Sequence, residues 1–187
     1  MDSQLEIEFK VLINQETYNK IRLDYQSLIT KTYIQTNYYL THPTLEKLKC
    51  MLRIREKENT YELTLKQKAK LGNIETNINI TKEVKDKIFC HQMVENEIFT
   101  ILKQYDIDMT TLENNYSLTT KRTDIILPLG LLSIDENQYL GTKDYEIEFE
   151  VTDYQKGKEA FLEIIKPYNI VYTTNCDSKI KRVLQAL

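Results

Sequence analysis

Regular alternation of apolar and charged side chains is the feature that most constrains how this chain can fold. In residues 5–13 apolar side chains occupy every second position and mostly charged ones lie between them; residues 51–56, 60–67 and 144–152 repeat the design. A period of two predicts β-strands, each with one buried apolar face. The opposite faces carry Glu6, Glu8, Lys10, Arg53, Arg55, Lys66, Glu146 and Glu148.

The other elements follow from propensity and helical spacing. The short polar segment 57–59 predicts an antiparallel hairpin between the strands that flank it. Further strands are expected at residues 32–40, 116–124, 129–135 and 171–174, with a strand or extended segment at 73–80. Helices are expected at residues 16–28, from 82 onward, at 94–103 and at 154–166. No long linker interrupts the sequence, so a single domain over residues 1–187 is predicted.

Composition excludes several classes of protein. The 187 residues carry a formal charge of −3, which argues against a broadly basic nucleic-acid surface. No apolar run approaches the roughly 20 residues of a membrane-spanning helix, and no signal peptide is visible at residues 1–10. The three cysteines have no Cys-x-x-Cys spacing, and their odd number suggests reduced thiols and a cytoplasmic location. The two histidines, His42 and His91, are expected at the surface.

The charged strand faces point to the chemistry. A single strand of this kind nearly always has a solvated outer face. Here, however, two E-x-E pairs stand near opposite ends of the chain, and a comparable set of cations accompanies them. If the strands close into a barrel under helices, the charges lie inside and must be compensated. Carboxylates suit Mg²⁺ or Mn²⁺, and Arg and Lys suit phosphate oxygens, so the pattern indicates a metal–polyphosphate complex.

The residues also resemble a known family. Leu5–Lys10, LEIEFK, resembles the E-x-E-x-K signature of the CYTH superfamily, the triphosphate tunnel metalloenzymes, and the likeness extends along essentially the whole chain. It is most similar to the YjbK-like bacterial branch. The segments that follow in the family's order are LRIREK (52–57), YELTLK (61–66), TTKR (119–122), DYEIEFEVTDYQKGKEAF (144–161) and SKIKR (178–182).

The resemblance implies an α+β fold, with an eight-stranded antiparallel β-barrel forming a tunnel and helices packed outside. It also implies a triphosphatase that uses Mg²⁺ or Mn²⁺. The matching catalytic residues are Glu6, Glu8 and Lys10. The matching phosphate-binding residues are Lys10, Arg53, Arg55, Lys66, Arg122 and Lys179. The matching metal ligands are Glu6, Glu8, Asp135, Glu146 and Glu148, and Glu75 matches a further acidic position.

Alternatives remain open at the level of the sequence. The substrate can be inorganic triphosphate, a nucleoside triphosphate or thiamine triphosphate, and no nucleic-acid or membrane partner is expected. The same superfamily includes class IV-type adenylate cyclases, and a non-catalytic polyphosphate-binding module is a third possibility. Two departures from the family pattern are YYLTHP at residues 38–43 and Glu136, which follows Asp135 where many members have His. The oligomeric state and the carboxylate that activates water are not specified.

Overall fold

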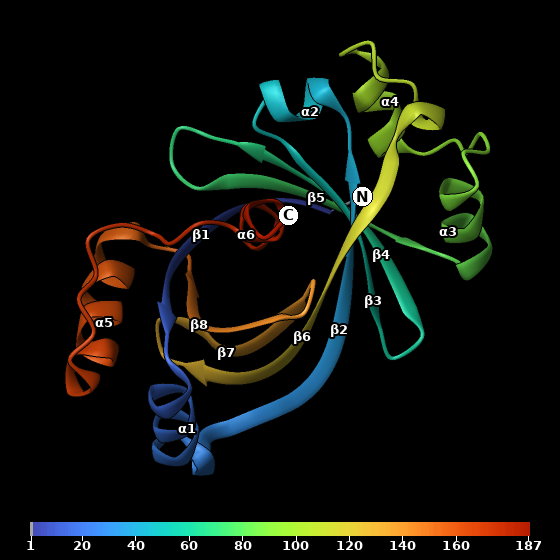
Figure 1. Ribbon diagram of the computed structural model, residues 1–187. Coiled ribbons are helices and arrows are strands. Elements are labelled where there is room, and N and C mark those ends of the chain that lie inside the picture. The colour runs from blue at the N-terminus through green and yellow to red at the C-terminus, as the bar shows by residue number, and fades with distance from the viewer. Residues whose placement is uncertain (1) are drawn as a thin grey trace. The chain divides into compact units, whose positions relative to one another are not determined.

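The computed structural model describes residues 2–187, and side chains from residue 3 onward. Eight strands form a closed antiparallel β-barrel in the order β1-β5-β4-β3-β2-β6-β7-β8, accompanied by helices (Figure 1), which confirms the predicted α+β class. The strands are β1 Asp2–Ile13, β2 Ile29–Thr41, β3 Met51–Lys57, β4 Thr60–Lys68, β5 Asn73–Ile80, β6 Glu113–Leu127, β7 Gly130–Tyr139 and β8 Thr142–Val151.

The chain divides into two compact units. The first unit comprises the residues up to Leu5 together with Gln35–Ser117, and the second comprises Glu6–Ile34 together with Leu118–Leu187. The expectation of a single domain over residues 1–187 stays a prediction. Within the described residues, no helix is both long and apolar enough to cross a membrane.

The first unit packs short helices on strands β3 and β4. Leu52 and Ile54 of β3 share one buried cluster with Leu63 of β4 and with Ile98 and Leu102 of α4. The two longer helices have side-chain N-caps: Thr81 caps α3 and Asn96 caps α4, each by accepting a backbone N–H of the first turn. The helical elements of this unit are α2 Pro43–Lys47, α3 Lys82–Phe89, α4 Glu97–Lys103 and the 3₁₀ turn Met109–Thr111.

The predicted hairpin between residues 51 and 67 is confirmed, and its turn is explained by local geometry. Lys57 pairs with Thr60, so only Glu58 and Asn59 form the loop. Both have positive φ, 50° and 62°, as a two-residue type I′ turn requires. Asn tolerates this left-handed conformation better than most residues, which favours the observed register.

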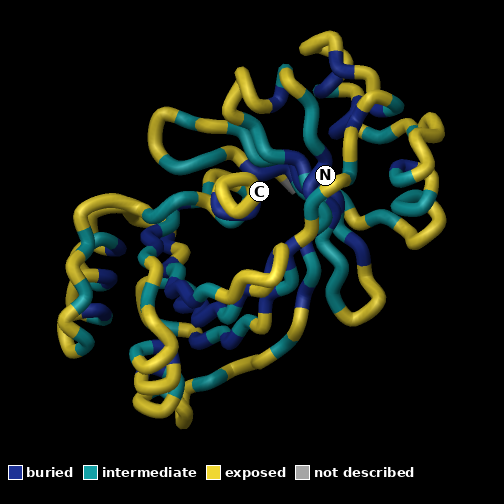
Figure 2. Tube along the Cα trace, viewed as in Figure 1, coloured by how far each residue is buried: buried dark blue, intermediate teal, exposed yellow. Residues whose placement is uncertain are grey.

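The second unit buries apolar residues of β1, β7 and β8 against α1 and α5. Phe9, Phe149 and Phe161 belong to one cluster, and Figure 2 shows the buried side of α5 facing β8. Gly157 permits this close approach, because a Cβ there would lie 2.4 Å from Val151 Cγ2. The helical elements are α1 Gln15–Asp24, α5 Tyr154–Ile165, α6 Lys179–Gln185 and the 3₁₀ turns Gln26–Leu28 and Lys166–Tyr168.

Two local predictions need correction. The helix expected at 16–28 ends at Asp24, and a 3₁₀ turn continues to Leu28. The strand expected at 171–174 is wrong, because this segment has no regular secondary structure. Val171 is 83% exposed, whereas Tyr172 packs its ring against Phe9 and Phe161, so the segment lacks the alternating burial of one face that stabilises a strand.

Candidate active site

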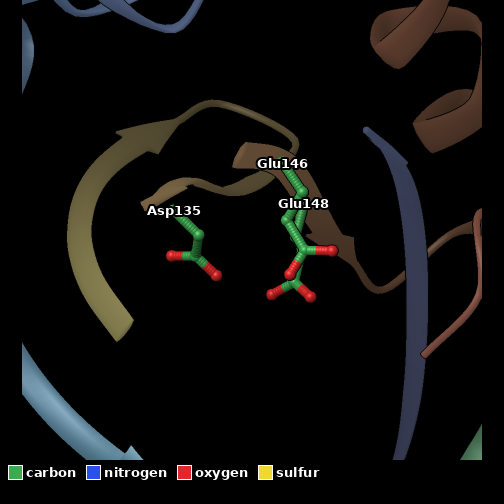
Figure 3. A group of neighbouring side chains, drawn as sticks. All are labelled: Asp135, Glu146 and Glu148. Carbon is green, nitrogen blue, oxygen red and sulfur yellow. The ribbon is translucent and has the colours of Figure 1, made fainter. Parts of the chain in front are cut away.

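The strand register of the second unit brings three acids together. Asp135 of β7 lies directly opposite Glu146 of β8, and Glu148 follows two residues later on the same face of β8. One carboxylate oxygen from each of the three lies within 4.8 Å of the others. Figure 3 shows the three side chains converging from these two neighbouring strands.

This acid cluster, Asp135, Glu146 and Glu148, has the donor chemistry of a divalent-metal site. Oxygen ligands in this number suit Mg²⁺ or Mn²⁺. Asp135 and Glu146 are fully buried, and carboxylates removed from water in this way need compensating cations. The residues present therefore fit the metal that the resemblance implies.

Two of the protein's own cations contact the acid cluster. Arg122 of β6 donates two bonds to Asp135, with Nε 2.9 Å from Oδ1 and Nη2 2.7 Å from Oδ2, and it also contacts Glu148. Lys179, the first residue of α6, places Nζ 2.9 Å from Asp135 Oδ2 and 2.9 Å from Glu148 Oε1. The same ammonium group contacts Glu146, so it meets all three acids.

Burial and these contacts together shift the pKa values of Glu146 and Glu148 in opposite directions. Burial raises the pKa of Glu146, despite the nearby Lys179. Burial also opposes ionisation of Glu148, but Lys179, Arg122 and Lys10 hold its pKa well below the ordinary value. Burial would lower the pKa of Lys179, but the three acids raise it instead. Lys179 is therefore a cation at neutral pH, and Glu148 is an anion.

The E-x-E-x-K motif lies on β1 in the same unit. Lys10 is opposite Glu148 in the β1–β8 register, and its Nζ lies 2.7 Å from Glu8 Oε1. Burial would lower the pKa of Lys10, but Glu8 and Glu148 raise it. Glu6 is partly buried and, two residues before Glu8, shares its strand face.

A segment just before α6 is bound to the backbone of this motif. The side chain of Asn175 accepts the N–H of Lys10 at 2.9 Å and donates to the carbonyl of Glu8 at 2.9 Å. The N–H of Cys176 donates to the carbonyl of Lys10 at 3.2 Å. These bonds fix the approach of the segment that carries Lys179.

Sequence reasoning missed Arg182, which anchors α6. Its Nε lies 2.8 Å from Asp144 Oδ2, and its Nη1 lies 3.0 Å from Glu146 Oε2. Asn137 supports the same acids by donating to Asp144 at 3.0 Å. The available signal was helical spacing, because Lys179 and Arg182 are three residues apart and share a helix face.

The first unit holds a second group of predicted residues. Lys66 of β4 is opposite Glu75 of β5, with Nζ 3.3 Å from Oε1, and Arg53 Nη2 lies 3.9 Å from the same oxygen. Arg55 donates from Nε to Asn37 Oδ1 at 3.0 Å. Burial would raise the pKa of Glu75, but Arg53, Lys66 and Arg55 lower it. The first unit thus collects cations around one buried acid.

The predicted residues therefore fall into two sets, one in each compact unit. The structure brings Asp135, Glu146, Glu148, Arg122 and Lys179 into one contact network. Lys181, two residues after Lys179, lies elsewhere: it is exposed and pairs with Asp177 at 2.7 Å, because residues two apart on a helix do not face the same side. The second unit also includes Glu6, Glu8 and Lys10, and the first includes Arg53, Arg55 and Lys66.

The similarity to known proteins extends over nearly the whole chain and includes all of these residues. The sequence model described as "CYTH domain" matches residues 4–182. A protein of Bacillus subtilis (strain 168), named "Putative triphosphatase YjbK", is 31% identical over 172 residues, which cover 91% of this chain and 90% of the relative.

Solved structures give the same likeness. A crystal structure of a Bacillus halodurans protein, described as a "putative adenylate cyclase", is 32% identical with a TM-score of 0.87, covering 97% of this chain and 98% of the other. A Hippeastrum protein, described as a "putative adenylyl cyclase" with a dominant triphosphatase activity, is 20% identical with a TM-score of 0.80. That alignment covers 97% of this chain and 96% of the other, and at this identity it shows the shared fold alone.

Proposed function

Because this chain belongs to the CYTH domain family, we propose that it is a triphosphatase that hydrolyses a triphosphate with a divalent metal. The observation that carries the proposal is the buried acid cluster, bordered by Arg122 and Lys179. Acids and cations in direct contact suit a substrate that is itself an anion bound with a cation. The similar Bacillus subtilis protein, named "Putative triphosphatase YjbK", supports the same reaction class.

In this proposal the cations hold phosphate oxygens. Arginine binds phosphate with two parallel N–H groups, whereas lysine acts as a compact charge. Their role is to neutralise the charge that repels an incoming nucleophile and that develops on the leaving group. The proposed phosphate-binding residues are Lys10, Arg53, Arg55, Lys66, Arg122 and Lys179.

The proposed metal is Mg²⁺ or Mn²⁺, held by carboxylate oxygens. When bound, it would supply a further positive charge that polarises phosphate oxygens. The metal-binding residues are Glu6, Glu8, Asp135, Glu146 and Glu148.

The proposed catalytic residues are Glu6, Glu8 and Lys10. A carboxylate of Glu6 or Glu8 orients or deprotonates the attacking water. Lys10 positions the carboxylate of Glu8, whose Oε1 lies 2.7 Å from Lys10 Nζ. Proton transfer to a positioned carboxylate of this kind contributes about 10²–10⁴-fold to a rate.

Adenylate cyclisation is the second candidate, because the 32%-identical Bacillus halodurans protein is described as a "putative adenylate cyclase". Cyclisation needs an adenine pocket and an activated ribose hydroxyl, and no sequence feature demands either. A pure phosphate-binding module is a weaker candidate, since inward carboxylates hinder an anion unless a metal accompanies it. We further propose a small-molecule triphosphate as the partner, and the three free thiols favour a cytoplasmic location.

A substrate panel tests the function. Purified protein is incubated with inorganic triphosphate, ATP, GTP and thiamine triphosphate, each with Mg²⁺, with Mn²⁺ and with EDTA. Metal-dependent phosphate release supports hydrolysis. Pyrophosphate and cyclic AMP from ATP would establish the cyclase instead, and binding without turnover would establish the module.

A double variant tests the site. Glu6→Gln with Glu8→Gln should abolish metal-dependent release while circular dichroism and the melting temperature remain close to those of the unmodified protein. Glu150→Gln is the matched control, because Glu150 is exposed on β8 and lies two residues beyond Glu148. Unchanged turnover in the double variant would contradict the assignment.

A further inference from the structure

Lys179 occupies a position that the proposed metal also requires. Its Nζ contacts a carboxylate oxygen of each of Asp135, Glu146 and Glu148. A divalent cation bound by one oxygen from each acid must lie between those oxygens, at about 2.0–2.6 Å from each. The ammonium group lies between the same three side chains, so the two positions overlap.

Both cations cannot occupy this position together. Like charges only a few ångströms apart repel strongly where water is excluded, and the side chain of Lys179 is 11% exposed. The ammonium group is well compensated, because it contacts a carboxylate oxygen of each of the three acids. A metal must therefore displace it before the three acids can act as ligands.

The structure allows the side chain to move while its helix stays in place. Arg182 holds α6 through Asp144, Glu146 and the carbonyl of Asp177, which its Nη1 reaches at 2.6 Å. Ser178 caps the helix by accepting the N–H of Lys181. Lys179 itself has a flexible four-carbon stem, so its ammonium group can leave the acids without unfolding α6.

We propose that Lys179 is an internal counter-ion that competes with the metal for the three acids and is displaced when metal binds. This inference rests on the proposed function and deepens it. The displaced ammonium group becomes available for the phosphate oxygens of the substrate, which couples metal loading to substrate binding. Lys179 thus has two alternating sets of partners, protein carboxylates and substrate phosphates.

Metal binding without substrate gives the decisive measurement. Mn²⁺ affinity is measured by calorimetry and by electron paramagnetic resonance of unbound Mn²⁺ for the unmodified protein, Lys179→Met and Lys179→Gln. Removing the competing charge should tighten Mn²⁺ binding at least about tenfold. Lys181→Met, which removes an exposed lysine of the same helix, should change it less than about twofold. Equal or weaker binding by both Lys179 variants would overturn the inference.

A second measurement needs no variant and so does not depend on how substitutions fold. The unmodified protein is treated briefly with acetic anhydride, with and without Mn²⁺, and lysine acetylation is read by mass spectrometry. Labelling of Lys179 should rise several-fold with Mn²⁺, whereas that of Lys181 should stay constant. Unchanged or reduced labelling of Lys179 would contradict its displacement.

The two proposals fail in different ways. If the unmodified protein hydrolyses a triphosphate with metal but the Lys179 variants gain no affinity for Mn²⁺, the counter-ion role is wrong and the function stands. If the variants bind Mn²⁺ more tightly but no protein hydrolyses any triphosphate, the counter-ion role stands and the proposed function is wrong.

Discussion

Arg122 and Asp135 form a two-bond ion pair between neighbouring strands, with donor–acceptor distances of 2.9 and 2.7 Å. The carboxylate of Asp135 is fully buried. Replacing both partners of such a buried pair by apolar residues often leaves the free energy of unfolding unchanged. Removing only one partner lowers it strongly, because the other charge is left buried and unpaired. The first prediction follows from this asymmetry.

Arg122→Ala should lower the free energy of unfolding by about 3 kcal/mol, because it removes the two-bond partner of a buried carboxylate. Urea unfolding followed by circular dichroism measures the change. Lys121→Ala is the control, since Lys121 is exposed and adjacent along the strand, and it should stay within about 0.5 kcal/mol. A loss no larger than that of the control would show that the pair is dispensable.

Glu75 should make stability depend on acid pH. Burial opposes its ionisation, yet Arg53 and Lys66 lower its pKa in the folded state, while the unfolded value is about 4.3. A lowered folded pKa contributes stability that is present above about pH 4.3 and is lost as pH falls through the folded pKa.

The Glu75→Gln variant isolates this contribution. The gap in unfolding free energy between the unmodified protein and Glu75→Gln, on the order of 1–3 kcal/mol, should be constant from about pH 6 to 8 and narrow below about pH 4. Urea titrations at each pH provide the values, with exposed Glu46→Gln as the control. A gap that widens in acid would mean that the sign of the shift is wrong.

Gly157→Ala should destabilise the protein by about 1–3 kcal/mol, because the new Cβ overlaps Val151. Helix propensity alone would favour alanine by about 1 kcal/mol, so the sign of the measured change separates packing from propensity. In a Val151→Ala background the penalty should shrink, as a double-mutant cycle would record. Additive effects of the two substitutions would argue that they do not meet.

The cysteines should differ sharply in reactivity. Cys90 is exposed, whereas burial and Glu146 raise the pKa of Cys176 to about 12. The thiolate is the nucleophile, so iodoacetamide at pH 8 should alkylate Cys90 much faster than Cys176. Mass spectrometry over a time course measures both rates in one sample. Comparable rates would show that the surroundings of Cys176 are more open than this structure has them.

Strand alternation predicted much of the fold because burial of one strand face imposes a period of two. The strands at residues 5–13 and 144–152 are confirmed, as are the eight-stranded class and the family. The same reasoning indicated the faces of Glu146 and Glu148. It could not give the strand register that places Asp135 opposite Glu146, since register depends on turn geometry and pairing between distant segments.

The sequence predicts the roles of the site residues less completely than it predicts the fold. The match to the family predicts that Lys179 binds phosphate, and that role stays a prediction, whereas its contacts with three acids emerge only in three dimensions. The sequence does not predict the roles of Arg182 and Asn175, because their partners lie on strands far away in the sequence. Hydrogen bonds between segments with such separations leave no local pattern of period or composition.

The amide of Asn175 bonds the backbone of Lys10 across a separation of 165 residues. Contacts of such high sequence separation form late, because the chain must first lose the conformational entropy of the intervening loop. During synthesis, β1 leaves the ribosome long before the segment that completes its surroundings. A growing chain therefore carries the E-x-E-x-K motif without the Asn175 contacts, and the acid cluster meets Lys179 only after residues 175–182 have emerged.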